Sequence, residues 1–500
     1  MSDEPTRVST GVPGLDEILR GGLPPNHVYL LEGPPGAGKT TLGLQFLREG
    51  VRRGEKVLYL TLLHAERTLE EMAASHGWDL AGIEIVSLVS ASVAESRVAE
   101  QTLLPSSEVQ LTDVMDQTKE AVNRIKPVRV VFDSIEQLRL LAGDPVIYRQ
   151  RILQMQRLME DSNITALFVE AIQAAPEFKT LAHGVISLDV VLRAYGEMRR
   201  SVRVEKMRSV AFAGGYHSFT IVSGGVEVFP RPSLGLKVTQ PESHWVFATS
   251  GIGELDTMLG GGLAYGTSCL ISGQVGTGKT SLATAYACEA AKRGQRSTIF
   301  LFDERINTFL IRTKGLGMDP LPWMEQGLIT VQRIDIGDLS AGEFAHRMRE
   351  AVEQRNDKIV VIDSLSGFAH AMIDEPEIIG QLHDTMTYLG QQGVLSLLLA
   401  SEHGIVGGQT LVDTSYLADT VILLRRFEAL GTIRIAISVI KRRYGDHEKA
   451  IRELQITSKG IVVGEPLKDF QGVLTGEPEY VGTRRELMEP GETTESKDAA

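Results

Sequence analysis

The stretch GPPGAGKTTL at residues 33–42 and the stretch GQVGTGKTSL at residues 273–282 carry the same glycine pattern, closed by Gly-Lys-Thr. Glycines at this spacing let the backbone turn tightly, so that several N–H groups point toward one anion. The lysine adds a cation, and the helix expected after it directs its positive end to the same place. Two such loops, each between a predicted strand and a predicted helix, indicate two sites that bind nucleotide phosphates.

Each loop supplies a defined set of candidate ligands. The threonine after the lysine is expected to bind Mg²⁺ through its hydroxyl, which makes Thr40 and Thr280 predicted metal ligands. Downstream, VRVVFDS and KIVVIDS end at Asp133 and Asp363, whose carboxylates are expected to hold a water on the Mg²⁺. The predicted nucleotide-binding residues of the loops are Gly33, Gly36, Gly38, Lys39, Thr40, Thr41, Gly273, Gly276, Gly278, Lys279, Thr280 and Ser281.

The similarity extends far beyond the loops, at a constant offset of 240 residues. TGVPGLDEILRGGL at 10–23 aligns with SGIGELDTMLGGGL at 250–263. In each copy, short apolar runs such as KVLYLTLL and STIFLFD alternate with stretches of helical spacing. This alternation predicts an α/β fold with two tandem domains, each a mostly parallel sheet flanked by helices.

The domain limits follow from the repeat and from composition. We expect a first domain at 1–230, a proline-containing linker at 231–246, a second domain at 247–466 and a disordered acidic tail at 467–500.

The overall composition narrows the class of protein. A chain of 500 residues with 43% hydrophobic and 23% charged residues is typical of folded soluble proteins. No apolar run is long enough to span a bilayer and no signal pattern is present, so a cytoplasmic location without membrane contact is expected. The net charge of −13 argues against broad nucleic-acid binding.

One acidic pair distinguishes the two copies. The second copy reads FLFDERINTFL at 300–310, where the first reads LTLLHAERTLE at 60–70. Hydrolysis of a phosphoanhydride needs a base that positions water in line with the terminal phosphate. Glu304 is the predicted base, at the end of a strand expected to adjoin the phosphate-loop strand, and Asp303 is expected to raise its basicity or share a proton. The alternative is two solvated acids that open a helix.

The first copy has Leu63 and His64 at these two positions. Leucine cannot move a proton, and histidine has a different shape and is partly charged near neutral pH. The first domain is therefore expected to bind nucleotide and to hydrolyse it slowly or not at all.

Near the end of each domain, a predicted strand carries a spaced basic pair: Lys206 with Arg208, and Lys441 with Arg443. Exposed cations on strands often serve only solubility. In an oligomeric phosphate-loop enzyme they can instead reach the γ-phosphate bound by a neighbour. We predict that Lys206 and Arg208 contact nucleotide, and that Lys441 and Arg443 act in catalysis from the adjacent subunit of a closed ring.

These motifs together resemble the KaiC family of RecA-like ATPases, through the doubled GxxxxGKT, the TGxxxLDxxLxGGL lead-in, Asp303-Glu304 and both K-x-R pairs. The resemblance covers nearly all of residues 6–470. It implies two RecA-like P-loop NTPase domains, a homohexameric double ring with ATP and Mg²⁺ at subunit interfaces, and ATPase with autokinase activity. It also implies clock or signalling proteins as partners.

The resemblance further places phosphoacceptors before the D-T-V-I-L-L strand, at Ser415 and Tyr416. Tyrosine replaces the usual serine or threonine there, and Leu63-His64 replaces the usual glutamate of the first domain. The tyrosine argues against a phosphorylation cycle on two serine or threonine residues, with Ser415 as the expected acceptor. The loss of the first-domain glutamate indicates a relative that keeps the assembly and acts in signalling or stress response rather than in timekeeping.

Two other classes of function remain open at this point. One is a nucleic-acid-dependent motor of the same superfamily, which would be stimulated by single-stranded DNA. The other is a nucleotide-gated scaffold without catalysis. The loops alone also leave GTP open as the nucleotide.

Overall fold

The computed structural model describes residues 7–88, 106–171, 176–192, 196–231, 246–335, 339–371, 378–401, 417–429, 431–474 and 479–481. The chain divides into two compact units. Within the described ranges, every helix is too short or too polar to cross a membrane.

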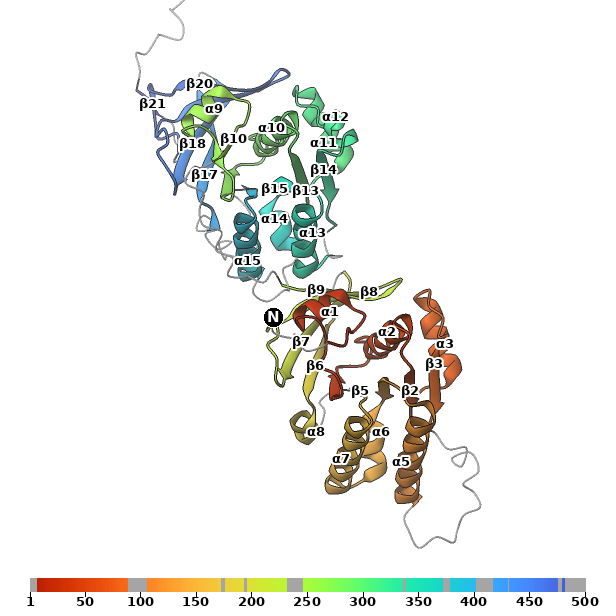
Figure 1. The fold of residues 1–500 in the computed structure, drawn as a ribbon. Coiled ribbons are helices and arrows are strands. Elements are labelled where there is room, and N and C mark those ends of the chain that lie inside the picture. Colours follow the sequence, from red (N-terminus) through yellow and green to blue (C-terminus); the bar gives the residue numbers. More distant parts are fainter. Residues whose placement is uncertain are drawn as a thin grey trace, which may run out of the picture. The chain divides into compact units, whose positions relative to one another are not determined.

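The first nine-stranded sheet has the order β3-β2-β4-β5-β1-β6-β7-β8-β9 (Figure 1). The strands from β3 to β6 in this order pair in parallel, and β7, β8 and β9 add an antiparallel extension. Their bounds are β1 (Val28–Glu32), β2 (Val57–Thr61), β3 (Ile83–Ser87), β4 (Arg129–Asp133), β5 (Thr165–Glu170), β6 (Gly184–Val191), β7 (Arg199–Met207), β8 (His217–Val222) and β9 (Gly225–Phe229).

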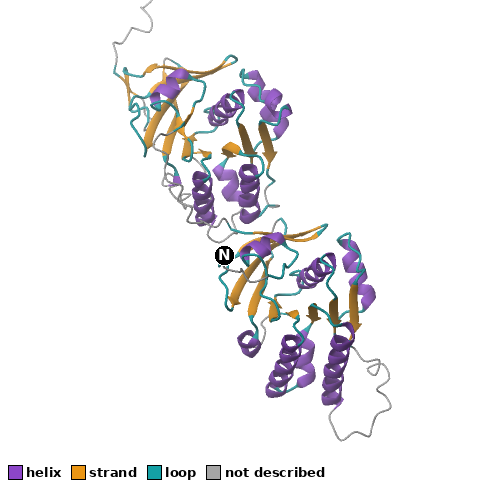
Figure 2. Ribbon diagram, viewed as in Figure 1, coloured by secondary structure: helices purple, strands orange, loops and turns teal. Residues whose placement is uncertain are grey.

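Helices cover both faces of this sheet (Figure 2). Successive strand residues point to opposite faces, so Leu30 and Leu31 of β1 belong to two different apolar clusters. One cluster holds Leu44 of α2 and the other holds Met155 of α7. The helices are α1 (Pro13–Ile18), α2 (Lys39–Arg52), α3 (Glu66–Ser75), α5 (Ser106–Ile125), α6 (Ile135–Ala142), α7 (Pro145–Asp161) and α8 (Pro176–Leu181).

The second nine-stranded sheet repeats this order as β14-β13-β15-β16-β12-β17-β18-β19-β20. Its strands are β12 (Ser268–Gly273), β13 (Arg296–Leu301), β14 (Ile329–Arg333), β15 (Asp357–Asp363), β16 (Leu395–Ser401), β17 (Thr420–Ala429), β18 (Thr432–Arg442), β19 (Arg452–Thr457) and β20 (Gly460–Pro466). A short antiparallel pair, β10 (Phe247–Ala248) and β11 (Leu263–Ala264), precedes it.

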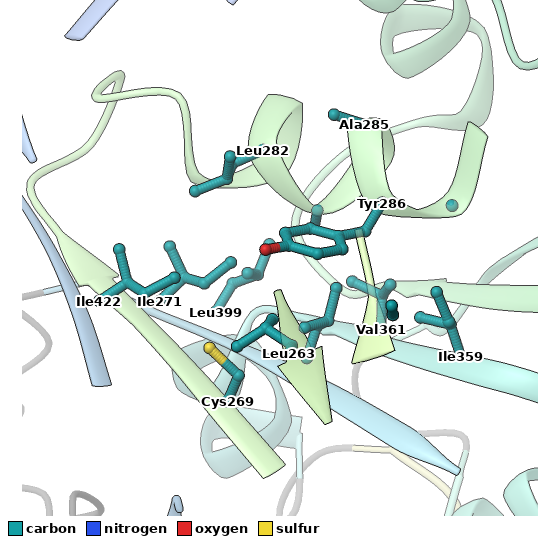
Figure 3. Packing of buried hydrophobic residues seen from close by; sticks show 14 of the residues in the cluster. Leu263, Cys269, Ile271, Leu282, Ala285, Tyr286, Ile359, Val361, Leu399 and Ile422 are labelled. Atoms are coloured by element: carbon teal, nitrogen blue, oxygen red, sulfur yellow. The ribbon is translucent and has the colours of Figure 1, made fainter. Parts of the chain in front are cut away.

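The helices of the second copy are α9 (Gly253–Met258), α10 (Lys279–Lys292), α11 (Ile306–Gly315), α12 (Leu321–Glu325), α13 (Ala341–Glu353), α14 (Leu365–Ala371) and α15 (Ile378–Gln391). Figure 3 shows how α10 is anchored: the ring of Tyr286 lies among sheet side chains that include Ile271, Val361 and Leu399. Tyr286 is fully buried. Because α10 begins at the second phosphate loop, this packing fixes the position of that loop.

The predicted fold class is therefore confirmed, because both copies form a mostly parallel sheet with helices on its faces. One detail of the prediction was wrong. The strand before Glu304 was expected to adjoin the phosphate-loop strand, yet β13 pairs with β14 and β15, and two strands separate it from β12. Chain order does not give strand order in such a sheet, because the crossover helices let the chain place later strands between earlier ones.

The ordered part of the chain extends beyond residue 466, where the acidic tail was predicted to begin. Val473 is buried against Phe427 and Ala436, and β21 (Phe470–Gln471) pairs with β22 (Glu479–Tyr480). The apolar side chains of this segment explain the difference, because burial of Val473 and Phe470 favours order over solvation. Most of the predicted linker, 232–245, lies outside the described residues.

A buried carboxyl group ends the strand beside the first phosphate-loop strand. Glu170 is only 1% exposed and lies opposite Glu32 of β1. Both of its carboxyl oxygens lack a hydrogen-bond partner among the described residues. The pKa of Glu170 is raised to about 7, chiefly by burial; Arg139 and Lys179 lower it, and Glu32 and Glu136 contribute to the rise.

We expect the substitution Glu170→Gln to stabilise the first domain at high pH only. The folded protein keeps the Glu170 proton up to about pH 7, while the unfolded chain loses it near 4.5, so this carboxyl destabilises the fold increasingly between these values. The gain in unfolding free energy should reach about 1–3 kcal/mol at pH 8 and vanish below pH 4.5. Thermal unfolding at pH 8 and at a pH below 4.5 measures the gain, with the exposed Glu71→Gln as a control. Equal changes in stability at the two pH values would contradict the raised pKa of Glu170.

Candidate functional site

Each phosphate loop ends at a glycine whose backbone conformation strongly favours glycine over every other residue. Gly38 and Gly278 precede α2 and α10 with φ of 92° and 93°, in the left-handed region. A Cβ on Gly278 would also lie 2.2 Å from Cδ1 of Ile456, a residue of β19. The loop therefore needs glycine for its conformation, and a side chain here would also displace the end of the Ile456 side chain.

The loop lysines lie folded onto the loops themselves. Nζ of Lys39 donates to the carbonyl oxygens of Gly33 at 2.7 Å and Pro34 at 3.0 Å. Nζ of Lys279 donates to Gly273 at 2.7 Å and to the next carbonyl at 2.8 Å. Burial lowers the pKa of Lys39, an effect that Asp133 and Glu136 oppose. Both ammonium groups thus lie where an outer phosphate could draw them away from the carbonyls.

The predicted metal ligands come together in both copies. Oγ1 of Thr40 donates to Oδ2 of Asp133 at 3.0 Å, and Oγ1 of Thr280 donates to Oδ2 of Asp363 at 2.7 Å. Mg²⁺ in nucleotide sites uses one or two protein oxygens, with phosphate and water supplying the rest. A hydroxyl and a carboxylate beside a phosphate loop fit this requirement.

The environment of the two aspartates differs. Burial raises the pKa of Asp363 to about 6, and Thr280 and Arg312 lower it. Asp133 instead accepts a second hydrogen bond, because the hydroxyl of the buried Tyr59 donates to the same Oδ2 at 2.6 Å. At the offset of 240 residues, Tyr59 corresponds to Ile299, which has no hydroxyl. A cation at the first site would have to compete with this additional donor.

The two residues of the acidic pair have different partners. Glu304 forms a two-pronged ion pair with Arg312 of α11, from Nε to Oε1 at 3.1 Å and from Nη2 to Oε2 at 2.6 Å. Asp303 instead accepts a hydrogen bond from the Ser364 hydroxyl at 2.6 Å. Ser364 directly follows Asp363, the predicted metal ligand, so both carboxylates lie near the phosphate loop but point to separate groups.

A cavity of about 880 Å³ joins Glu304 to the loop. Its walls are formed on one side by the loop and α11, and on the other by β18 and β19. This volume is within the range of small-molecule binding sites. Its lining residues from the loop side are Gly276, Gly278, Lys279, Thr280, Ser281, Glu304 and Arg312.

The corresponding positions of the first copy lack this arrangement. Leu63 is 55% exposed. The backbone N–H of His64 donates to Oγ1 of Thr61 at 2.8 Å, which shapes the turn after β2. Glu66, the next acidic residue, is exposed at the start of α3. Oγ1 of Thr41, in the first loop, lies 3.5 Å from Nε2 of the His76 imidazole.

Both basic pairs lie at the edge of the sheet opposite their own loops. Lys206 is opposite Val185 at the start of β6, and Lys441 is opposite Val421 at the start of β17. Because β6 and β17 run parallel to β1 and β12, the phosphate loops follow the other end of these strands. A strand of five residues spans roughly 16 Å, so neither pair reaches the loop of its own sheet.

At that edge the basic side chains bind local acceptors. Nζ of Lys206 donates to the carbonyls of Lys179, Thr180 and Ala182, at 2.8, 3.0 and 2.8 Å, and Arg208 also donates to Thr180 at 2.7 Å. In the second copy, Lys441 donates to Ala418 at 2.8 Å, and Arg443 pairs with Asp419 at 3.3 Å. The predicted phosphoacceptors Ser415 and Tyr416 lie outside the described residues.

Reasoning from sequence missed three side chains at these sites: Tyr59, Glu170 and Arg312. For two of them the signal was present in the repeat, since Tyr59 aligns with Ile299 and Arg312 aligns with Met72 at the offset of 240 residues. Comparing the copies at every position, instead of only at motifs, would have found both. Glu170 could be found only through strand order, because its burial depends on which strands flank β5.

Comparison with known proteins agrees with this geometry. Similar proteins include the circadian clock protein KaiC3 of Synechocystis sp., 27% identical over 487 residues, which cover 95% of each chain. The circadian clock oscillator protein KaiC of Synechococcus elongatus is 27% identical over 94% of this chain and 92% of its own. The protein of that name from Acaryochloris marina is 25% identical over 96% of this chain and 92% of its own.

A family model described as "ATPase: KaiC" matches residues 8–233 and matches a second time at residues 248–468. Each match contains one phosphate loop, one threonine–aspartate pair and one basic pair. The two matches together cover most of the chain. The chain therefore belongs to the KaiC family of ATPases, with two tandem copies of its domain.

Proposed function

We propose that the chain is a Mg²⁺-dependent ATPase, assembled as a homohexameric double ring, whose second domain carries most of the hydrolysis. The observation that supports this division is that two otherwise matching sites differ in their acidic residues. Glu304 lines a cavity with Lys279 and Thr280, whereas the first copy has Leu63 and His64 at the corresponding positions.

In the second site, Thr280 and Asp363 would hold Mg²⁺, which neutralises charge on the phosphates. Lys279 would exchange its two carbonyl acceptors for the outer phosphates. Glu304 would accept a proton from water placed in line with the terminal phosphate. Asp303, bound to the Ser364 hydroxyl, would keep the turn after β13 next to the metal-site strand.

In the first site, Lys39 and Thr40 would bind ATP with little turnover, so that the nucleotide mainly holds subunits together. Two features support this role. His64 cannot replace a carboxylate in shape or charge, and Tyr59 donates to the metal-site carboxylate of Asp133. The second feature weakens the aspartate as a partner for a cation.

The position of the basic pairs supports the proposed ring. Each pair lies at the edge opposite its own loop, so a contact with phosphate requires a loop from another subunit. Lys441 and Arg443 would then act in catalysis in trans, and Lys206 and Arg208 would contact the nucleotide of the first ring. Since each subunit completes the site of the next, a closed ring satisfies all sites.

A serine autokinase activity of the second domain, at Ser415 or Tyr416, completes the proposal. The resemblance to the KaiC family supports this activity. The names of similar proteins refer to the circadian clock and make clock or signalling proteins candidate partners. A cytoplasmic location is part of the same proposal. A nucleic-acid-dependent ATPase and a scaffold without catalysis are the competing functions, and phosphate release measured with and without single-stranded DNA separates all three.

The substitution Glu304→Gln tests the division of labour. It keeps the size of the side chain but removes the base, so kcat for ATP hydrolysis should fall about 100-fold or more. The matched change His64→Gln in the first domain should alter kcat less than about twofold. Steady-state phosphate release measures both, with ATP-dependent assembly as the check on folding; the reverse pattern would contradict the proposal.

A subunit-mixing experiment tests action in trans. The variants Lys441→Ala and Lys279→Ala should each hydrolyse almost no ATP in the second ring. The first variant lacks the cation donated to the neighbour, and the second lacks the lysine of the phosphate loop. Mixed rings should recover about a quarter of the wild-type activity, since that fraction of interfaces pairs an intact loop with an intact Lys441. Mixtures that stay inactive, although mixed rings form, would show that Lys441 does not act across the interface.

Intact-mass analysis after incubation with ATP tests the kinase activity. A mass gain of one phosphate per chain is expected in the wild type, and it should disappear in Ser415→Ala while ATP hydrolysis continues. Tyr416→Phe serves as the matched variant, because the two hydroxyls are adjacent. If no phosphate appears on the wild-type chain under turnover, the chain is not an autokinase.

A further inference from the structure

The predicted base of the second site is not free in the structure. Both oxygens of Glu304 accept hydrogen bonds from the Arg312 guanidinium, at 3.1 and 2.6 Å. Glu304 and Arg312 are partly buried, with 24% and 33% of their side chains exposed. A two-pronged pair of this kind is stronger and more directional than an ordinary surface pair. It occupies one acceptor site on each carboxylate oxygen and places a cation against the predicted base, which competes with water for the carboxylate.

Arg312 is held at the wall of the nucleotide cavity. Its guanidinium lies 5.8 Å from the ring centroid of the buried Phe309, one turn earlier on α11. Nη1 is also 3.4 Å from Oγ of Ser281, the residue after the metal-binding threonine. The same cation lowers the pKa of Asp363, so its field reaches the metal-site strand. Arg312 thus lies between the carboxylate and the place where phosphates are expected.

The first copy has neither member of this ion pair. At the offset of 240 residues, Glu304 corresponds to His64 and Arg312 corresponds to Met72. Met72 and Arg312 lie on helices that match in the same register, α3 at Glu66–Ser75 and α11 at Ile306–Gly315. The cation is therefore present where the base is present and absent where the base is absent, which associates Arg312 with hydrolysis rather than with the fold.

We propose that Arg312 is a positioning residue that masks Glu304 until a nucleoside triphosphate binds, and that it then exchanges the carboxylate for the terminal phosphate. The proposal rests on the proposed role of Glu304 as the base. A triphosphate is the stronger attractor, because it brings several negative charges into the cavity that Arg312 already lines. The exchange frees the oxygens of Glu304 for water only when a substrate is present.

The exchange has a specific kinetic signature. Without Arg312, the terminal phosphate loses one charge-assisted hydrogen-bond donor, so KM for ATP should rise about tenfold. Glu304 is then unmasked at all times, so kcat should stay equal to the wild-type value or exceed it. Affinity for ADP should change less than about twofold, because ADP lacks the phosphate that replaces the carboxylate.

The substitution Arg312→Met tests this signature with the residue that the same helix position carries in the first domain. Steady-state hydrolysis gives kcat and KM for the wild type, Arg312→Met and the conservative Arg312→Lys, which should recover part of the ATP affinity. Equilibrium binding of ATP and ADP in the Glu304→Gln background gives the affinities without turnover. Circular dichroism and ATP-dependent assembly show that each variant folds.

The possible outcomes separate this inference from the function on which it rests. If kcat of Arg312→Met falls as far as that of Glu304→Gln, Arg312 acts in the chemical step and does not mask the base. If the affinities for ATP and ADP fall equally in Arg312→Met, Arg312 does not exchange Glu304 for the terminal phosphate. If Glu304→Gln itself keeps wild-type turnover, the proposed base is wrong, whatever Arg312 does.

Discussion

The threonine-to-aspartate hydrogen bond is the contact on which both sites depend. It links the first turn of the helix after each phosphate loop to the end of a strand that is not the loop's neighbour, Thr40 to Asp133 and Thr280 to Asp363. The bond holds only if the loop glycines keep their left-handed conformation and the helix stays packed on the sheet, as Tyr286 packs in the second copy. Loop, helix and central strands thus form one unit in each sheet.

Upon this shared frame, a few side chains give the two sites different chemistry. The second site combines a carboxylate and an arginine at the cavity wall, Glu304 and Arg312. The first has His64 and Met72 at those positions, and adds Tyr59 as a second donor to its aspartate. Under the proposed function, such a duplicated fold holds one nucleotide for assembly and hydrolyses another, because the phosphate loops and the predicted base lie on different elements.

Much of the fold could be predicted from sequence because both loops and both central strands carry local patterns. The exact repeat spacing then matched the phosphate-loop residues and the positions of the acidic pair between the copies, whereas the strand aspartates and the basic pairs were matched by their local patterns. The features that the sequence did not predict depend on contacts between distant parts of the chain. Two strands separate β13 from β12, and Val473 packs against Phe427 and Ala436. The contact of Asp303 with Ser364 is long-range in the same way. Arg312 lies only eight residues after Glu304, on the next helix, so its pairing was within reach of a closer comparison of the two copies.

The central claim is that two sites of one geometry differ in hydrolysis, and the nucleotide bound at each site reports on it most directly. A high-resolution structure of the assembled protein, frozen after incubation with ATP and Mg²⁺, would identify the nucleotide in each ring. The account predicts intact ATP beside Lys39 and ADP beside Lys279. ADP in the first ring with intact ATP in the second, or a chain that stays monomeric with saturating ATP, would contradict it.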